Sequence, residues 1–197
     1  QLVPSTVFGY SNGLPPMPFD PAEGKRLLAE AGWARGFDSD ILLPDYFRGA
    51  AEELRARLAP LGVRLHPVVL PFAEFNERWR AGDVPVTLVG WGAGTGDASD
   101  LFDALLHTPD NGYGRSNYFG YSNPEMDRLI ELSDRTLDPA ARHESLTKAQ
   151  EILRRDLPLV PLVLRDDLYA VRRDLVWTPR PDRRIRAFDF KLAQPVK

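Results

Sequence analysis

The 197-residue sequence contains no cysteine. Disulfide bonds, thiolate metal sites and a cysteine nucleophile are therefore excluded, while the redox compartment stays open. Histidine is scarce too, because His66, His107 and His143 are far apart and match no metal-ligand spacing. No apolar run reaches the roughly 20 residues that cross a bilayer, and the first ten residues lack the pattern of a signal peptide. We therefore expect no metal site and no cofactor.

The sequence also lacks a charge excess. It has 25 basic and 28 acidic residues, for a net charge of -3. Such a balance gives no broad positive field for nucleic acid or for an anionic membrane, so neither is an expected partner. The hydrophobic content of 43% is enough for a real core. The length fits one compact domain with a trailing tail.

One glycine-rich stretch, residues 86–97 (VTLVGWGAGTGD), draws attention as a binding site. Its apolar start predicts a strand that is covered on both faces. Glycines at every second position from Gly90 to Gly96 let the backbone approach a ligand, and Trp91 lies where the strand ends. Polar residues follow at Thr95, Asp97, Ser99 and Asp100. This is the layout of a site at the carboxyl end of a strand, although a strand, turn and helix without ligand would have the same pattern.

Familiar catalytic motifs are missing around this loop. It has neither the lysine of a P-loop nor the third glycine of a dinucleotide fingerprint. Ser99, Asp100 and His107 lack the strained nucleophile turn of a hydrolase. Asp166 and Asp167 are most simply a turn. A loop rich in aromatic residues (107–122) follows, and this combination favours binding over catalysis.

Helices and strands alternate along the first half of the chain. Strands are expected at 41–43, 63–70 and up to Val86, with helices between them, which predicts an α/β fold with parallel neighbours. Helix starts are marked by Asp20 with Pro21, by Asn123 with Pro124 and by Asp138 with Pro139. Apolar runs at 159–164, 168–172 and near 187–192 predict three further strands.

Several stretches in their order resemble the C-terminal lobe of the family 5 extracellular solute-binding proteins, the dipeptide- and oligopeptide-binding type that serves ABC importers. They are FDPAEGKRLLAEAGW at 19–33, LAPLGVRL at 58–65, the GW pair at 90–91, GYSNPEMDRLI at 120–130 after Asn117, Arg142 with KAQEIL at 148–153, and DLPLVPL at 156–162. The resemblance implies a periplasmic-binding-protein-like α/β lobe with a mixed sheet flanked by helices, of type II and cluster C. It also implies a first segment (1–19) arriving from a missing N-terminal lobe, a C-terminal lobe (20–173), and a tail (174–197) that packs on the lobe or returns to the missing one.

By this resemblance, the full protein is an exported monomer, periplasmic or extracellular and in some cases lipid-anchored. It captures a peptide or peptide-like solute between two closing lobes, delivers it to a membrane permease and is not an enzyme. An oligosaccharide or another small solute is the alternative, since Trp91 and Tyr118 suit stacking on a sugar ring. From other classes, a stand-alone α/β hydrolase using Asp100 or His107 and a protein-docking module remain open.

In peptide-binding members, an aspartate three positions beyond the tryptophan pairs with the ammonium group of the ligand, and here that position is Gly94. Asp97 or Asp100 is expected to replace it, or the solute has no ammonium group. Two of the candidate residues have a simpler interpretation than ligand binding. Asn117 can fix the loop through bonds to its backbone, and Arg115 can face solvent. The expected ligand-binding residues are Trp91, Gly92, Gly94, Thr95, Asp97, Asp100, Arg115, Asn117 and Tyr118.

Overall fold

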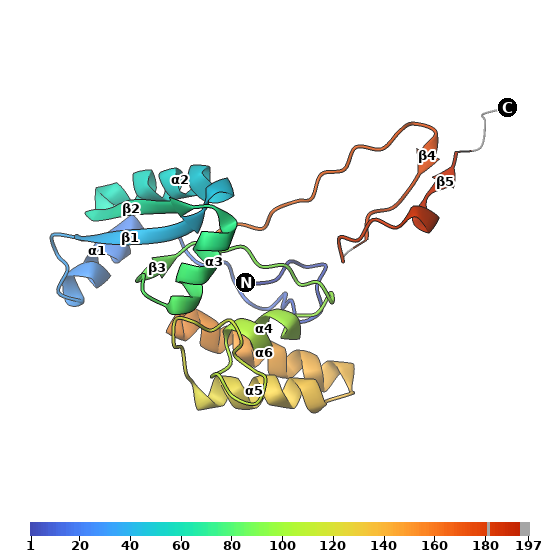
Figure 1. Ribbon diagram of the computed structural model, residues 1–197. Coiled ribbons are helices and arrows are strands. Elements are labelled where there is room, and N and C mark those ends of the chain that lie inside the picture. The colour runs from blue at the N-terminus through green and yellow to red at the C-terminus, as the bar shows by residue number, and fades with distance from the viewer. Residues whose placement is uncertain (181, 194–197) are drawn as a thin grey trace. The chain divides into compact units, whose positions relative to one another are not determined.

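The computed structural model describes residues 1–180 and 182–193 and divides into two compact units (Figure 1). The sheet unit is Pro16–Trp91, and the helical unit joins Gln1–Pro15 to the described residues from Gly92 onward. The sequence predicted one compact domain, and the structure has two units. The expected lobe of residues 20–173 spans parts of both, and its boundaries stay a prediction.

The sheet unit is built on a three-stranded parallel sheet with strand order β2-β1-β3. A helix precedes β1 and a helix follows each of β1 and β2, which confirms the predicted α/β alternation. The elements in chain order are α1 (Pro21–Glu30), β1 (Phe37–Pro44), the 3-10 turn η1 (Asp45–Phe47), α2 (Arg48–Leu58), the 3-10 turn η2 (Ala59–Leu61), β2 (Val63–Leu70), α3 (Phe72–Ala81) and β3 (Val86–Thr87).

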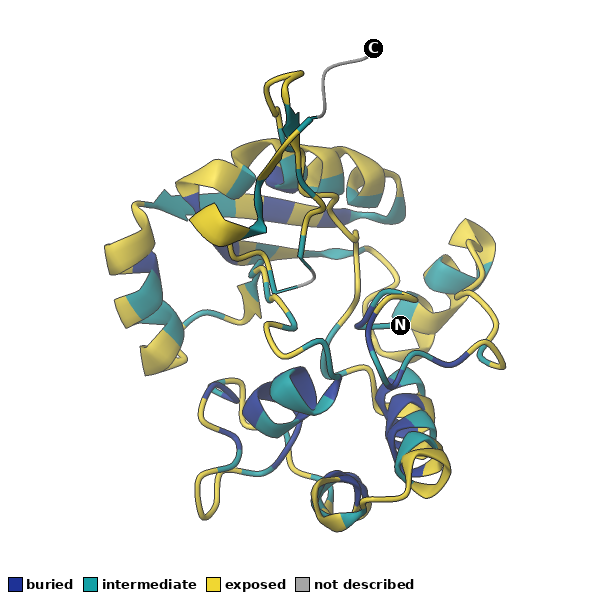
Figure 2. Cartoon of the chain, turned by 90° about the vertical axis from the view of Figure 1, so that its right-hand side faces the viewer, coloured by how far each residue is buried: buried dark blue, intermediate teal, exposed yellow. Residues whose placement is uncertain are grey.

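Residues 41–44 at the end of β1 are all buried, so side chains on both faces of the sheet are covered. Figure 2 colours each residue by its burial and shows buried segments in the strands of the sheet. Ile41 and Leu43 join Val63 and Leu65 of β2 in one cluster with Ala51 of α2. Leu42 occupies the alternate position and is completely buried. Burial of these branched side chains is the main source of stability for this unit.

The third strand is shorter and more open than its sequence suggests. Only Val86 and Thr87 pair with β1, and Val86 is 37% exposed. The prediction of a strand covered on both faces was therefore wrong. In the described sheet β3 is an edge strand, and β1 is its one neighbour. The apolar residues of β3 are therefore only partly buried.

The helical unit contains α4 (Ser99–Leu105), α5 (Pro124–Arg135) and α6 (Pro139–Asp156). The side chains of Asn123 and Asp138 cap α5 and α6 by accepting bonds from free backbone amides, as the sequence predicts. The inward face of α5 is buried, at Met126, Leu129, Ile130 and Ser133. These local patterns were sufficient to place the helices.

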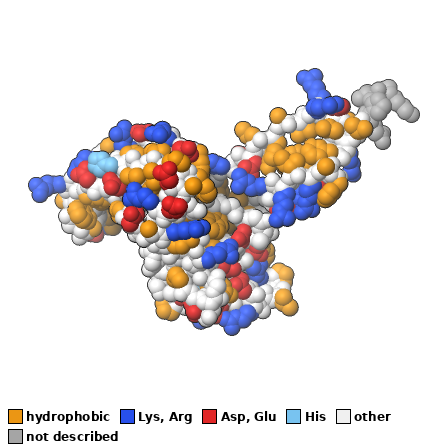
Figure 3. All heavy atoms as spheres, viewed as in Figure 1, with side chains coloured by type: hydrophobic (Ala, Val, Ile, Leu, Met, Phe, Trp, Pro, Cys, Tyr) orange, Lys and Arg blue, Asp and Glu red, His pale blue; other side chains and the backbone are white. Residues whose placement is uncertain are grey.

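A C-terminal arm (residues 157–180 and 182–193) follows α6. The strands predicted at 159–164 and 168–172 are wrong, because these residues form neither helix nor strand. Near 187–192, a 3-10 turn η3 (Ala187–Asp189) precedes the two-residue strand β5 (Lys191–Leu192), which pairs antiparallel with β4 (Leu175–Val176). Trp177 stacks on Phe190 at 5.3 Å between ring centroids. Figure 3 shows hydrophobic side chains along the arm. Among the residues of the arm, Leu162, Val163, Leu164 and Leu168 are exposed.

Candidate functional site

The glycine loop (residues 92–98) is held by the first segment of the chain. The backbone of Phe8 donates to Gly96 O at 3.0 Å and accepts from Ala98 N at 2.9 Å. Gly9 has a φ of +94°, and a Cβ at this position would lie 2.7 Å from the Cβ of Ala98. Only glycine allows so close an approach, so the first segment and the loop are fitted to one another.

Asp97 stabilises the loop from within. Its carboxylate pairs with both terminal nitrogens of Arg142 on α6 and accepts from the Ser99 backbone amide at 3.0 Å. Burial alone would raise the pKa of Asp97, but the bonds from Arg142 and Ser99 outweigh it and hold the pKa below the ordinary value. Both oxygens are thus engaged inside the protein, which leaves Asp97 poorly suited to bind a solute.

Asp100 has a different environment on the first turn of α4. One oxygen accepts from the Gly94 backbone amide at 2.9 Å, and the other lies 3.7 Å from a terminal nitrogen of Arg115. A Cβ at position 94 would lie 3.7 Å from the same Asp100 oxygen that accepts the Gly94 bond. The side chain is 20% exposed. The Asp100 carboxylate therefore lies next to the place where a side chain at position 94 would begin.

The remaining predicted residues divide by environment. Asn117 is 4% exposed, and its amide binds the carbonyls of His107 and Tyr121 and the amide of Tyr121, so it fixes the 107–122 loop. Gly92 and Thr95 are exposed, Arg115 has a side chain that is 63% exposed, and Tyr118 is half-buried. Trp91, half-buried, is the last residue of the sheet unit, whereas the other eight predicted residues belong to the helical unit.

His107, which follows α4, belongs to a cluster of polar side chains. His107 is 3% exposed, stacks on Tyr113 at 4.3 Å and approaches Glu131 at 3.5 Å. Burial raises the pKa of Asp103 to about 7, and the charge of Asp134 adds to the shift while His107 and Arg115 oppose it. In the described part of the chain no hydrogen bond joins His107 to Ser99 or Asp100. The geometry gives no support to a triad of these residues.

Sequence reasoning missed the partners that hold the loop. Arg142 was noted only within a matching stretch, yet its guanidinium both pairs with Asp97 and lies 5.1 Å above the Phe8 ring. Phe8, in the first segment, was not singled out at all. A chain separation of 45 residues between Asp97 and Arg142 leaves no local pattern by which the pair could be found.

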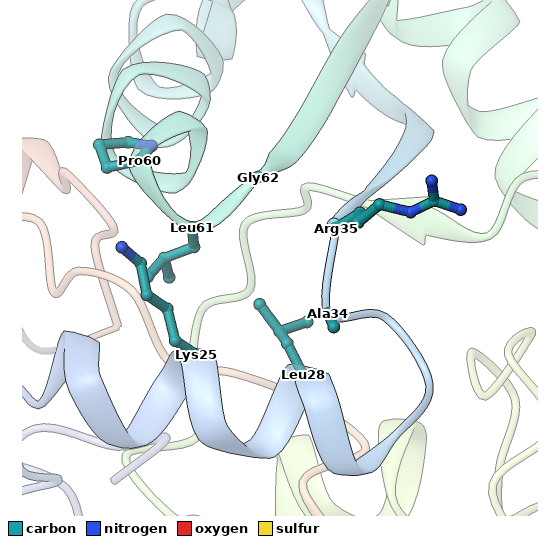
Figure 4. A pocket seen from close by; sticks show the side chains of 7 residues that line it. All are labelled: Lys25, Leu28, Ala34, Arg35, Pro60, Leu61 and Gly62. Carbon is teal, nitrogen blue, oxygen red and sulfur yellow. The ribbon is translucent and has the colours of Figure 1, made fainter.

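Two hollows lie in the sheet unit, and the residues that line them all precede the glycine loop in the sequence. The smaller, about 290 Å³, is bounded by Lys25 and Leu28 of α1, by Leu61 of η2 and by the loop before β1 (Figure 4). The larger, about 730 Å³, contains Asp38, whose pKa is lowered to about 2 by hydrogen bonds from Arg64 and His66. Both flank the amino-terminal halves of β1 and β2, whereas ligands of parallel sheets bind at the carboxyl ends.

Among the described residues, no helix is long and apolar enough to cross a membrane. The same residues contain no group of three or more histidine, cysteine, aspartate or glutamate side chains arranged to hold a metal ion.

Parallel α/β units, and exposed glycine loops that carry a carboxylate, are both typical of the class of ligand-binding proteins. The family model of the bacterial extracellular solute-binding proteins, family 5 middle, matches residues 1–113. The chain belongs to this family, as its sequence motifs indicated.

Individual relatives agree with the family. The chain is 28% identical to heme-binding protein A of Haemophilus influenzae over 167 residues, which cover 81% of the chain and 30% of the relative. It is 27% identical to the dipeptide-binding protein of Escherichia coli over 182 residues, which cover 89% of the chain and 34% of the relative. The structure of the periplasmic binding protein DppA of Helicobacter pylori, in complex with the peptide STSA, matches with a TM-score of 0.74 at 26% identity, covering 81% of this chain and 31% of that one. The chain thus spans about a third of the length of these curated relatives.

Proposed function

We propose that this chain is the C-terminal lobe of a substrate-binding protein that captures a peptide or peptide-like solute for an ABC importer. The partners of this lobe would be an N-terminal lobe of the same protein and a permease in the membrane. We infer that it acts outside the cytoplasmic membrane, in the periplasm or at the cell surface, and that its role is binding rather than catalysis.

The names of the relatives support a peptide. One similar protein is called a dipeptide-binding protein, and another was solved with the peptide STSA. Heme-binding protein A, at a comparable identity, bears a name that points to a different solute. The choice between solutes therefore depends on the groups that this chain itself presents.

The observation that carries the proposal is the position of Asp100. Its carboxylate is oriented by the Gly94 amide and lies beside position 94, while Asp97 is engaged by Arg142. A carboxylate in a partly desolvated site that still has acceptor capacity can bind an ammonium group. We propose that Asp100, rather than Asp97, pairs with the amino terminus of the solute.

A solute without an ammonium group, such as an oligosaccharide, is the second candidate. It is favoured by Gly94 itself, because that position carries no charge, and by Arg115, which lies 3.7 Å from an Asp100 oxygen and competes for the carboxylate. In that case Asp100 would accept hydrogen bonds from hydroxyl groups rather than pair with a cation.

Titration calorimetry on the full-length protein that contains this chain tests the proposal. A panel of dipeptides and their N-acetylated forms is measured against the wild type and Asp100→Asn. Losing a charge-assisted bond should weaken binding of the free dipeptides by about 10- to 100-fold. Acetylated dipeptides, which lack the ammonium group, should bind weakly to both proteins and show little effect of the substitution.

Asp110→Asn serves as the matched control, since Asp110 is an exposed aspartate of the same unit and its side chain makes no bond in the described structure. This control should bind like the wild type. If Asp100→Asn and Asp110→Asn bound free dipeptides equally well, the assignment of Asp100 would be abandoned.

A further inference from the structure

The two ring nitrogens of the buried residue His107 have different environments. Nδ1 lies 2.6 Å from the backbone carbonyl oxygen of Thr108. A carbonyl oxygen only accepts, so Nδ1 must bear the hydrogen and donate it. In the neutral ring, Nε2 is then an acceptor, and it is buried without a hydrogen bond to any described residue. A buried acceptor that lacks a donor is unfavourable.

Glu131 of α5 faces this nitrogen. Its Oε1 atom lies 3.5 Å from Nε2 of His107, while its Oε2 atom pairs with Arg135. A carboxylate oxygen and a bare ring nitrogen repel one another when no hydrogen lies between them. A proton on Nε2 makes the ring a donor and a cation, and so replaces the repulsion by a charge-assisted pair. Because the Glu131 side chain is 38% exposed, a small change of rotamer is enough to close the remaining distance.

The charges around the ring favour this protonation. Burial and the charge of Asp134 raise the pKa of Asp103 to about 7, and a positive charge on His107 opposes that shift. The nearby arginines each face another carboxylate already. The titratable and charged groups around the ring are Asp103 of α4, Tyr113 and Arg115 of the following loop, Asp127, Glu131, Asp134 and Arg135 of α5, and Arg142 of α6.

The same contacts hold the 107–122 loop on α5. The Thr108 backbone amide donates to Asp127 Oδ1 at 2.9 Å, and the Asn117 side-chain amide donates to the His107 carbonyl at 3.0 Å. Tyr113 stacks on the imidazole with ring centroids 4.3 Å apart, and its hydroxyl donates to Asp134 at 2.8 Å. A charged imidazole is attracted to the face of a tyrosine ring. Charging His107 therefore strengthens contacts that fix the loop.

We propose that His107 is a proton-dependent positioning residue, whose charged ring pairs with Glu131 and holds the 107–122 loop more tightly in mild acid than at neutral pH. The stabilisation is present while the ring carries the proton and is lost as the pH rises. All the groups involved belong to the helical unit. The inference goes beyond the proposed function and does not depend on it, because the loop can be observed without a solute.

Hydrogen exchange followed by mass spectrometry on the full-length protein that contains this chain tests the inference. Peptides from the 107–122 loop are compared at about pH 5.5 and about pH 7.5, on either side of the range in which histidine ordinarily titrates. Exposure times are corrected for the intrinsic exchange rate at each pH. The corrected exchange of the loop should be at least about threefold slower in acid. Peptides from α2, which contains no histidine, give the reference and should show no such change.

Two variants assign the effect to the pair. Glu131→Gln removes the carboxylate and leaves the ring in place, whereas His107→Gln removes the ring. In both, the slowing in acid should fall below about 1.5-fold. Should His107→Gln fail to fold, Glu131→Gln decides alone.

Arg135→Gln is the matched control, because it removes the other partner of Glu131 and leaves Oε1 facing His107. This control should keep the slowing of the wild type. A slowing that persists in Glu131→Gln would overturn the inference, as would a wild-type loop whose corrected exchange is equally fast or faster in acid.

Discussion

Asp97 and Asp100 are three residues apart, yet their carboxylates have opposite roles. Asp97 caps the turn at Ser99 and pairs with Arg142, whose side chain is 20% exposed. The Asp100 carboxylate accepts one backbone hydrogen bond, from Gly94, and its other oxygen lies 3.7 Å from the exposed side chain of Arg115. An ion pair that is largely desolvated and bidentate contributes more to stability than one at the surface.

We therefore expect Asp97→Asn to lower the free energy of unfolding by about 2 kcal/mol, because Arg142 would lose its partner while largely buried. Chemical denaturation at neutral pH measures the change. Because the pKa of Asp97 is held below its ordinary 3.8, its stabilisation is complete above that pH and is lost as the pH falls through the lowered pKa. The difference between wild type and variant should accordingly shrink in acid.

Asp100→Asn provides the comparison, with an expected loss below about 1 kcal/mol. Equal losses for the two variants would contradict the division of roles. Sequence alone left both aspartates open as ligand residues, since the distinction depends on Arg142, which approaches Asp97 only after α6 has packed. The glycine pattern indicates the loop, but the sequence does not show which of its carboxylates is already engaged inside the protein.

At the scale of elements, the sheet unit depends on a close backbone contact between Gly36, before β1, and Gly62, before β2. Gly36 has a φ of +75°, and a Cβ there would lie 1.9 Å from the Gly62 carbonyl oxygen. Neither the conformation nor the space allows a side chain. This contact sets the start of both strands and hence their register, which begins with Phe37 opposite Val63.

Gly36→Ala should therefore destabilise the protein by about 3 kcal/mol or more, through strain and through separation of β1 from β2. Gly49→Ala is the matched control, since Gly49 lies inside α2 with nothing within 4 Å of its Cβ position. Better helix propensity should make that variant about 0.5–1 kcal/mol more stable. Thermal denaturation of the two variants and the wild type measures these changes in stability. A Gly36→Ala protein as stable as the wild type would contradict the role given to the contact between Gly36 and Gly62.

Helices were easier to predict than strands for a physical reason. The side chains of Asp20, Asn123 and Asp138 cap backbone amides that lie no more than three residues further along the chain. Both groups of each hydrogen bond therefore lie in one short stretch of sequence, where the cap can be recognised. A strand needs a neighbour, and the apolar runs at 159–164 and 168–172 have none in the described structure. For a similar reason the cluster around His107 was missed, because Glu131 meets the ring only once α4 and α5 have packed together.

At the scale of the whole molecule, the C-terminal arm exposes an apolar surface. Leu168 is 93% exposed, and Val163 and Leu192 are also largely exposed. Exposed apolar side chains gathered on one segment are typical of an interaction site. The chain spans about a third of the length of its curated relatives, and we propose that a further part of the same protein covers the arm.

Limited trypsin digestion tests this expectation by comparing the 197-residue chain with the full-length protein. Arg173 is exposed and lies in the arm outside any helix or strand, so cleavage after it should be fast in the 197-residue chain. In the full-length protein, burial of the arm should slow this cleavage by at least about 10-fold. Mass spectrometry of the early fragments identifies the cut.

Arg128 gives an internal standard in the same digestion. It is exposed on α5, whose inward face is buried, and cleavage there requires the helix to open. That cut should be slow in both proteins, so a change at Arg173 alone reports on the arm rather than on general stability. Equal cleavage after Arg173 in the two proteins would mean that the missing lobe leaves the arm uncovered, and its apolar side chains would then need a second protein as their partner.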